Sequence, residues 1–175
     1  MSNTLQFRTA TEYDCTELAL MLDVAGRRLP SYLWSQEVGQ GQSYFEYGRE
    51  KIRIDANNNA YFRNWLVAES QSKFVGAFFG FSVEDPYPEI DLDAVPVWWR
   101  PCKELERVAS GCWLLQVIAI LPQYRGKGLA RQLLDKAESV ARDSGTNRIA
   151  LQVEERGGPG CLYSQTRFIS GSPAS

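Results

Sequence analysis

The spacing of apolar residues changes twice between residues 112 and 154. Residues 113–120 (WLLQVIAI) are apolar except for Gln116, and a run this short predicts a buried strand rather than a helix. Residues 148–153 alternate between polar and apolar, which predicts a second strand. Between them, apolar residues recur at helical spacing and end at Gly145, a residue typical of a helix C-terminus. These helical positions are Leu129, Leu133, Leu134, Ala137, Val140 and Ala141. The order predicts one right-handed strand–helix–strand crossover.

The first 81 residues contain weaker patterns of the same kind. Residues 5–8 alternate as a strand does, and Thr11 with Asp14 predicts a capping box before a helix that ends near Gly26. Residues 29–34 are expected to form an aromatic-rich connection, and residues 44–54 a second helix. Residues 65–69 and 74–81 flank the polar turn 70–73, which predicts a hairpin. Both faces of 74–81 are apolar, with Phe74 and Phe78 on one and Ala77 and Phe79 on the other. We therefore expect a central strand that pairs with 113–120.

The connection 84–111 is far longer than a hairpin loop, so it is a lid, an insertion or a segment with its own helix. Its first half is acidic and proline-rich, and residues 101–109 predict a short helix with proline in its first turn. Two interpretations stay open. The acidic residues together with Trp98 and Trp99 hold a cationic amine, or the segment is a solvated loop that the tryptophans attach to the core.

Composition excludes several classes of protein. The chain has 175 residues, is 44% hydrophobic and carries a net charge of -2, as expected of one globular domain spanning 1–175 without a nucleic-acid partner. It has no apolar run long enough for a membrane span, and residues 1–10 have no signal-peptide core, so we expect a cytoplasmic protein with no membrane partner. There is no histidine, and the four cysteines share no CxxC spacing, so we expect no metal site. Histidine-based catalytic triads are excluded as well.

The turn at 121–128 has the chemistry of an anion site. The first amides of a helix have no partner within it, the helix dipole adds positive charge, and glycine lets a ligand approach the backbone. Arg125 and Lys127 add full charges. The pattern therefore predicts a phosphate or pyrophosphate site. It is not a P-loop, and Gly126 with Gly128 satisfies only the first half of a dinucleotide fingerprint.

The turn resembles the acyl-CoA-binding motif R/Q-x-x-G-x-G/A of the GNAT superfamily of N-acyltransferases. Arg125, Gly128 and Ala130 occupy its three fixed positions, and the flanking strands and helix are where the family has them. The resemblance implies an α/β (α+β) fold, a mixed and mostly antiparallel central sheet flanked by helices. It also implies transfer of an acetyl group from acetyl-CoA to a primary amine, carried by a small molecule or a peptide.

The same resemblance implies roles for individual residues. The pantetheine arm would pair with the backbone of Ile118, Ala119 and Ile120, and the amide of Ala119 or Ile120 would polarise the thioester carbonyl. The family's tyrosine acid corresponds to Tyr163. For the base, the candidates are Glu104, Glu106, Glu154 and water, since Gln116 is the only polar residue of the strand at 113–120. The pyrophosphate would rest on the amides of Arg125, Gly126, Lys127, Gly128, Leu129 and Ala130.

The resemblance weakens after residue 153. Arg156 and Pro159 stand where the family commonly has Asn and Ala, and Arg167 replaces a glycine. The alternative function is therefore a catalytically impaired acyl-CoA-binding or partner-binding module of the same fold.

Residues 169–175 predict a disordered tail, so we expect the C-terminal strand pair to be shortened or missing. The edge of the strand at 148–153 would then be open, and we expect a homodimer that covers it, or a truncated family member.

Overall fold

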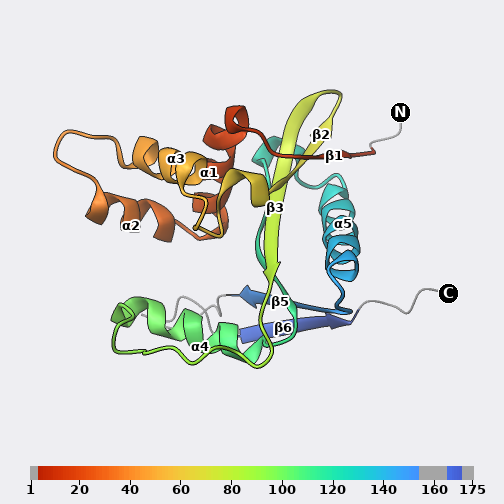
Figure 1. Ribbon diagram of the computed structural model, residues 1–175. Coiled ribbons are helices and arrows are strands. Elements are labelled where there is room, and N and C mark those ends of the chain that lie inside the picture. The colour runs from red at the N-terminus through yellow and green to blue at the C-terminus, as the bar shows by residue number, and fades with distance from the viewer. Residues whose placement is uncertain (1–3, 154–164, 171–175) are drawn as a thin grey trace. The chain divides into compact units, whose positions relative to one another are not determined.

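The structure, a computed structural model, describes residues 4–153 and 165–170 (Figure 1). The chain forms two compact units. Unit 1 contains residues 1–80 and 117–136, and unit 2 contains residues 81–116 and 137–175. Whether the chain is one folding domain stays a prediction.

Six strands follow one another in the hydrogen-bonded order β1-β2-β3-β4-β5-β6. β1 with β2, β2 with β3 and β5 with β6 are antiparallel pairs, while β4 and β5 run parallel. The predicted fold class, a mixed and mostly antiparallel sheet with flanking helices, is confirmed. The strand bounds are β1 Gln6–Thr9, β2 Leu66–Ser70, β3 Lys73–Ser82, β4 Trp113–Ile120, β5 Arg148–Val153 and β6 Gln165–Ser170.

Helices cover both sides of the strands in unit 1. Figure 1 shows α1 (Cys15–Ala25), α2 (Leu29–Glu37) and α3 (Tyr44–Ile54) together on one side of β1–β3, and the beginning of α5 (Leu129–Asp143) on the other. The main core lies beneath α1–α3, where Leu18 and Met21 of α1 meet Ile52 of α3 and Val67 of β2, all at most 1% exposed. Burial of this apolar surface is the main favourable contribution to folding.

Residues 29–37 form a helix, so the predicted connection at 29–34 is wrong. Pro30 lies in the first turn of α2, where a missing N–H costs nothing, and the Asp23 carboxylate accepts a hydrogen bond from the Ser31 amide at 2.9 Å. The capping group comes from α1, eight residues earlier in the sequence. That distance explains why a local pattern did not indicate a helix start.

β3 contains a β-bulge, and because of it Phe74 lies on the opposite face of the strand from the one predicted. β2 pairs Ala68 with Gly76 but Glu69 with Phe74, so Val75 is an extra residue. Phe74 consequently packs against the same core as Ala77 and Phe79, instead of facing the other way with Phe78. The predicted central position of β3 is confirmed, since it lies between β2 and β4.

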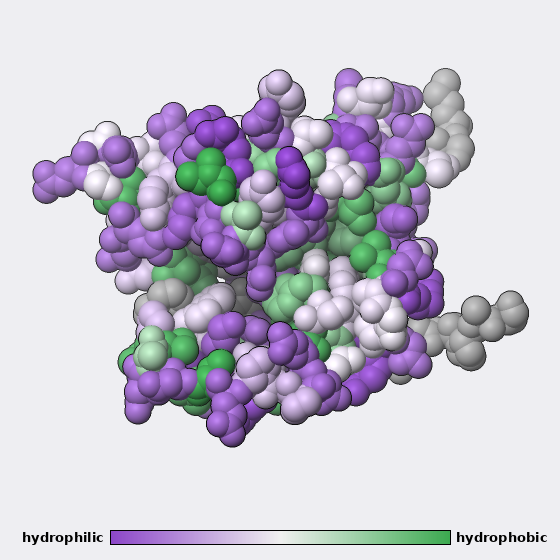
Figure 2. Space-filling view, in the orientation of Figure 1, coloured by the Kyte–Doolittle hydropathy of each residue, from purple (hydrophilic) through white to green (hydrophobic). Residues whose placement is uncertain are grey.

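Unit 2 contains the long connection, and the predicted helix there is α4 (Arg100–Val108), with proline in its first turn. Ala109, directly after α4, packs with Val83, Cys112, Leu114 and Ala150. Val97 and Val108 remain 73% and 59% exposed, and Figure 2 shows apolar atoms among polar ones where Figure 1 places α4.

The C-terminal segment forms a strand where none was expected. β6 pairs with β5 along its whole length, from Arg148 opposite Ser170 to Val153 opposite Gln165. The expected tail at 169–175 thus begins inside a strand. The C-terminal strand pair typical of the family was expected to be shortened or missing, and one strand, β6, is described after residue 153. Because β6 pairs with β5, β5 is not an open edge of the sheet. The reason for proposing a homodimer at β5 is therefore removed.

Candidate functional site

A cavity of about 380 Å³ lies in unit 1, where β4 leads into α5. Eight of the nine predicted cofactor-binding residues line it, and Lys127 does not. Tyr124 and Leu134 also line it, although sequence reasoning assigned neither to the site; Leu134 belongs to the apolar stripe of α5. The complete lining is Ile118, Ala119, Ile120, Tyr124, Arg125, Gly126, Gly128, Leu129, Ala130 and Leu134.

β4 forms one wall of the cavity. Ile118, Ala119 and Ile120 line it, and Ala119 also packs against the main core. The Ala119 carbonyl oxygen lies directly against Gly76 of β3, where a Cβ atom would collide with it. Glycine at position 76 is therefore required by this path of β4. The pairing of β4 with β5 extends from Trp113 to Leu115, and β4 continues for five further residues toward the cavity.

The turn beside the cavity contains backbone amides that have no partner among the described residues. The N–H groups of residues 126–130 donate no hydrogen bond to any residue that the structure describes. Gly126 and Gly128 have φ values of 73° and 74°, in the left-handed region that favours glycine. The Arg125 amide is different, because it donates to the Pro122 carbonyl at 3.2 Å. Of the six amides expected to meet a pyrophosphate, five are free.

Polar side chains of the chain itself accept backbone N–H groups within or just before the other α-helices of unit 1. Before α1, the Asp14 carboxylate accepts a hydrogen bond from the Thr11 amide at 2.7 Å. In α2 the Ser31 amide donates to the Asp23 carboxylate, and in α3 the Glu46 amide donates to the Ser43 hydroxyl at 3.3 Å. The first turn of α5 contains no acidic residue. Its positive end is therefore open to an external anion.

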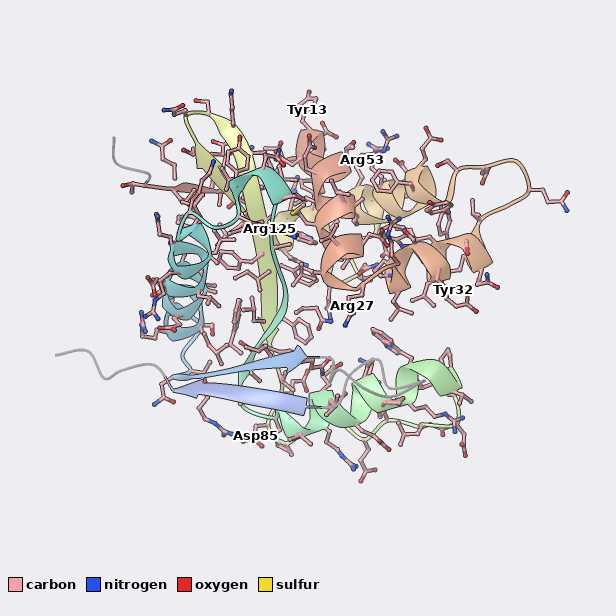
Figure 3. All side chains as sticks on the ribbon, turned by 180° about the vertical axis from the view of Figure 1, so that it is seen from behind. Tyr13, Arg27, Tyr32, Arg53, Asp85 and Arg125 are labelled. Atoms are coloured by element: carbon pink, nitrogen blue, oxygen red, sulfur yellow. The ribbon has the colours of Figure 1, made fainter. Side chains whose placement is uncertain are left out.

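Two basic side chains lie on this turn in different ways. The Arg125 Nε–H donates to the Ile120 carbonyl at 3.2 Å, and Figure 3 labels this residue on the segment between β4 and α5. The Lys127 ammonium lies 5.5 Å from the centre of the Tyr124 ring, a cation–π distance. Tyr124 lines the cavity, so Lys127 is held beside the site without lining it.

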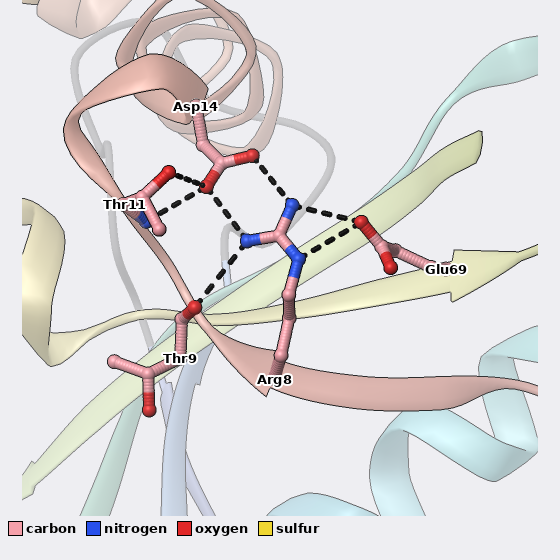
Figure 4. Close-up of polar contacts among 5 residues, drawn as sticks. All are labelled: Arg8, Thr9, Thr11, Asp14 and Glu69. Carbon is pink, nitrogen blue, oxygen red and sulfur yellow. Dashed lines mark hydrogen bonds and ion pairs between the residues drawn. The ribbon is translucent and has the colours of Figure 1, made fainter. Parts of the chain in front are cut away.

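The predicted capping box at Thr11 and Asp14 is confirmed, and it belongs to a larger polar network (Figure 4). Arg8 makes two hydrogen bonds of 2.8 Å to the Asp14 carboxylate and one of 2.9 Å to Glu69 on β2. Burial alone would raise the pKa of Asp14, but the hydrogen bonds from Arg8 and Thr11 lower it. The hydrogen bonds to Asp14 raise the pKa of the Arg8 guanidinium, against burial. This network joins β1, β2 and α1 and leaves no anion site at the start of α1.

The catalytic candidates that the sequence indicated lie outside the described residues or in unit 2. Tyr163 and Glu154 lie outside the described residues. Glu106, in unit 2, forms an ion pair with Lys103 at 2.9 Å. Burial, together with Glu106, raises the pKa of Tyr87 to about 12. Glu104 lines a different cavity, of about 250 Å³, together with Tyr87, Lys103 and Arg107.

Three of the four cysteines lie among the described residues. Cys15, Cys102 and Cys112 are free and buried, and Cys161 lies outside the described residues. Burial raises the pKa of Cys15 and of Cys102 to about 11, so neither is a ready nucleophile at neutral pH. Among the described residues no three acidic, cysteine or histidine side chains converge as metal ligands. None of the helices within 4–153 is long and apolar enough to cross a membrane.

The fold is an α/β arrangement in which β4 leads through a glycine-containing turn into α5, and a cavity lies at that turn. A model of the Acetyltransferase (GNAT) family matches residues 29–159. The chain therefore belongs to the GNAT family of acetyltransferases, and the predicted family is confirmed. No curated protein matches the sequence.

Solved structures share this fold at low sequence identity. A crystal structure described as an acetyltransferase is 20% identical, with a TM-score of 0.57 over 85% of this chain and 80% of its own. PH1933 from Pyrococcus horikoshii OT3 is 12% identical, with a TM-score of 0.56 over 97% and 99% of the two chains. An N-acetyltransferase from Staphylococcus aureus Mu50 is 16% identical, with a TM-score of 0.50 over 85% and 81%.

Proposed function

We propose that the protein is an acyl-CoA-dependent N-acyltransferase that moves an acetyl group from acetyl-CoA to a primary amine of a small molecule or peptide. The observation that carries the proposal is the run of five free amides at residues 126–130 at the start of α5. Such a run of amides suits a pyrophosphate. CoA contains a pyrophosphate that links its nucleotide to the extended pantetheine arm. Family membership supports acyl transfer as the reaction.

In this proposal CoA lies along the cavity, with its pyrophosphate at the start of α5 and its pantetheine arm beside β4. The pyrophosphate accepts hydrogen bonds from the amides of Gly126, Lys127, Gly128, Leu129 and Ala130, beside Arg125. The pantetheine arm pairs with β4 at Ile118, Ala119 and Ile120. The support is that β4 continues beyond its pairing with β5, and that these three residues line the same cavity as the free amides.

The reaction is a direct attack of the amine on the thioester. The neutral amine nitrogen forms a bond to the carbonyl carbon, the C–S bond breaks, and the thiolate receives a proton to leave as the thiol of CoA. The backbone amide of Ala119 or Ile120 would polarise the carbonyl, and Tyr163 would donate the proton. β4 contains no carboxylate, so water takes the proton from the amine, and positioning of the two substrates supplies much of the rate.

The proposal is tested by two measurements on the purified chain. Isothermal titration calorimetry with CoA should show binding, and a thiol reagent should detect CoA released from acetyl-CoA when an amine panel is added. Tyr163→Phe should lower the turnover rate by roughly tenfold to a hundredfold without weakening CoA binding, if the tyrosine is the acid. Absence of CoA binding by the unmodified protein would refute the proposal.

A second function is favoured by the sequence after residue 153. Arg156, Pro159 and Arg167 replace residues common in the family, so this segment suits a CoA-binding or partner-binding module without transferase activity. The two functions differ in one outcome. The module binds CoA but releases no thiol with any amine of the panel.

A further inference from the structure

The side chain of Arg125 is committed to the protein backbone. Its Nε–H donates to the carbonyl of Ile120 at 3.2 Å, across the 3₁₀ turn Pro122–Tyr124. Its own amide donates to the Pro122 carbonyl, and the Tyr124 amide donates to the Leu121 carbonyl at 3.0 Å. The bond from Arg125 therefore joins the beginning of the glycine-containing turn to the last residue of β4.

The acceptor, the carbonyl oxygen of Ile120, is not used in the pairing of β4 with β3. The Leu121 amide points to β3, since it donates to the Val75 carbonyl at 2.9 Å. Successive residues of a strand direct their polar groups to opposite edges, so the carbonyl of Ile120 points away from β3. The Arg125 side chain donates to this carbonyl. The unpaired edge of β4 therefore ends at Ile120, where the turn begins.

From this geometry we infer that Arg125 is a positioning residue of the proposed CoA site. Its Nε–H holds the turn at 121–128 against β4, so that the amides of residues 126–130 converge before a ligand arrives. The inference rests on the proposed function, because convergence matters only if an anion binds there. It assigns the main role of Arg125 to a hydrogen bond and not to its charge.

The donor atom makes the inference testable. Arg Nε follows Cδ, and the side-chain amide nitrogen of Gln occupies the same position in its own side chain. Lys has a carbon atom at that point and keeps the charge, while Met has neither charge nor donor.

Arg125→Gln, Arg125→Lys and Arg125→Met separate the donor from the charge. Arg131→Gln is the control, because Arg131 lies in the first turn of α5, is paired with Asp135 at 2.8 Å and does not line the cavity. Titration calorimetry with CoA at several salt concentrations is the first measurement. We expect Arg125→Gln to bind within roughly threefold of the unmodified protein, and Arg125→Lys and Arg125→Met to bind roughly tenfold more weakly. A direct charge contact would instead reduce the salt dependence in Arg125→Gln and Arg125→Met alike.

The second measurement needs no ligand. Heteronuclear ¹⁵N relaxation of residues 123–128 should be unchanged in Arg125→Gln and should show greater fast motion in the Lys and Met variants. If Arg125→Lys binds CoA normally and Arg125→Gln does not, the inference is overturned. It is also overturned if relaxation is the same in all three variants. If the unmodified protein fails to bind CoA, the proposed function fails, and the relaxation data still decide whether Arg125 orders the turn.

Discussion

Unit 1 begins two of its helices in opposite ways. At α1 the Asp14 carboxylate, held by Arg8 and Thr11, lies at the helix start and satisfies the chain's own donors. At α5 the amides of residues 126–130 remain free, and the nearby guanidinium of Arg125 binds a carbonyl. Orphan amides are common to every helix N-terminus, so an orphan amide alone indicates little. What distinguishes α5 is that no residue within 4–153 or 165–170 supplies an acceptor for the amides of residues 126–130.

The two junctions also differ in what they contribute. The network at α1 connects two strands and a helix, so its loss should reduce stability and leave ligand binding unchanged. The turn at 121–128 is joined to β3 by the Leu121 amide and to β4 by the bond from Arg125 to Ile120, and it contains no comparable network of ion pairs among the described residues. Its loss should reduce ligand binding and affect stability less.

The largest effect is expected from Gly128→Glu. A carboxylate among the free amides would repel a pyrophosphate by about 3 kcal/mol at a separation of about 5 Å and an effective dielectric constant of about 20, so CoA affinity should fall roughly a hundredfold. Gly41→Glu is the matched control, because Gly41 also has a positive φ, 79°, and open space around it. Equal CoA affinity for Gly128→Glu and the control in calorimetry would show that α5 is not the anion site.

Asp14→Asn should produce the largest loss of stability. It removes a carboxylate that is 8% exposed and leaves the Arg8 guanidinium without its main partner. We expect the free energy of unfolding to fall by about 2 kcal/mol, measured by urea denaturation. The CoA dissociation constant should stay the same. Asp55→Asn is the control, since Asp55 accepts only an exposed local hydrogen bond. A large change in CoA affinity in Asp14→Asn would contradict the separation of the two junctions.

A smaller effect is expected from pH, and it should be specific to α1. The pKa of Asp14 is lowered in the folded protein, so its stabilisation is present above the unfolded pKa of about 4 and is lost as the pH falls through the folded value. The stability difference between the unmodified protein and Asp14→Asn should be constant above about pH 5 and should shrink below about pH 4. Urea denaturation across this range measures it. A difference that grows as the pH falls would have the wrong sign.

The smallest effect is expected from Lys127→Met. The ammonium stands over the Tyr124 ring and does not line the cavity, so it acts on an anion through solvent. We expect CoA affinity to fall by roughly twofold to fourfold at low salt and the loss to vanish as salt increases. Lys73→Met, at the exposed start of β3, is the control. A loss of more than about tenfold that persists at high salt would place Lys127 in direct contact with the ligand.

Sequence patterns predicted the central part of the fold closely. The strands at 113–120 and 148–153 and the helix at 44–54 have the predicted bounds, and the helix after residue 128 begins where the stripe begins. Periodicity works here because each element is long and its apolar face is regular. The same patterns missed α2, whose start depends on Asp23 in the preceding helix, and β6, which is formed by pairing with β5.

The sequence by itself therefore determined the order of the elements and the residue types at the β4–α5 turn, since periodicity, glycine and charge are local properties. Tertiary structure decided which groups at that turn are free. The Arg125 amide and guanidinium are both used by the backbone, the five following amides are not, and Gly76 admits the path of β4 beside the cavity. Whether a donor is satisfied depends on every chain segment that reaches it, and no single stretch of sequence contains that information.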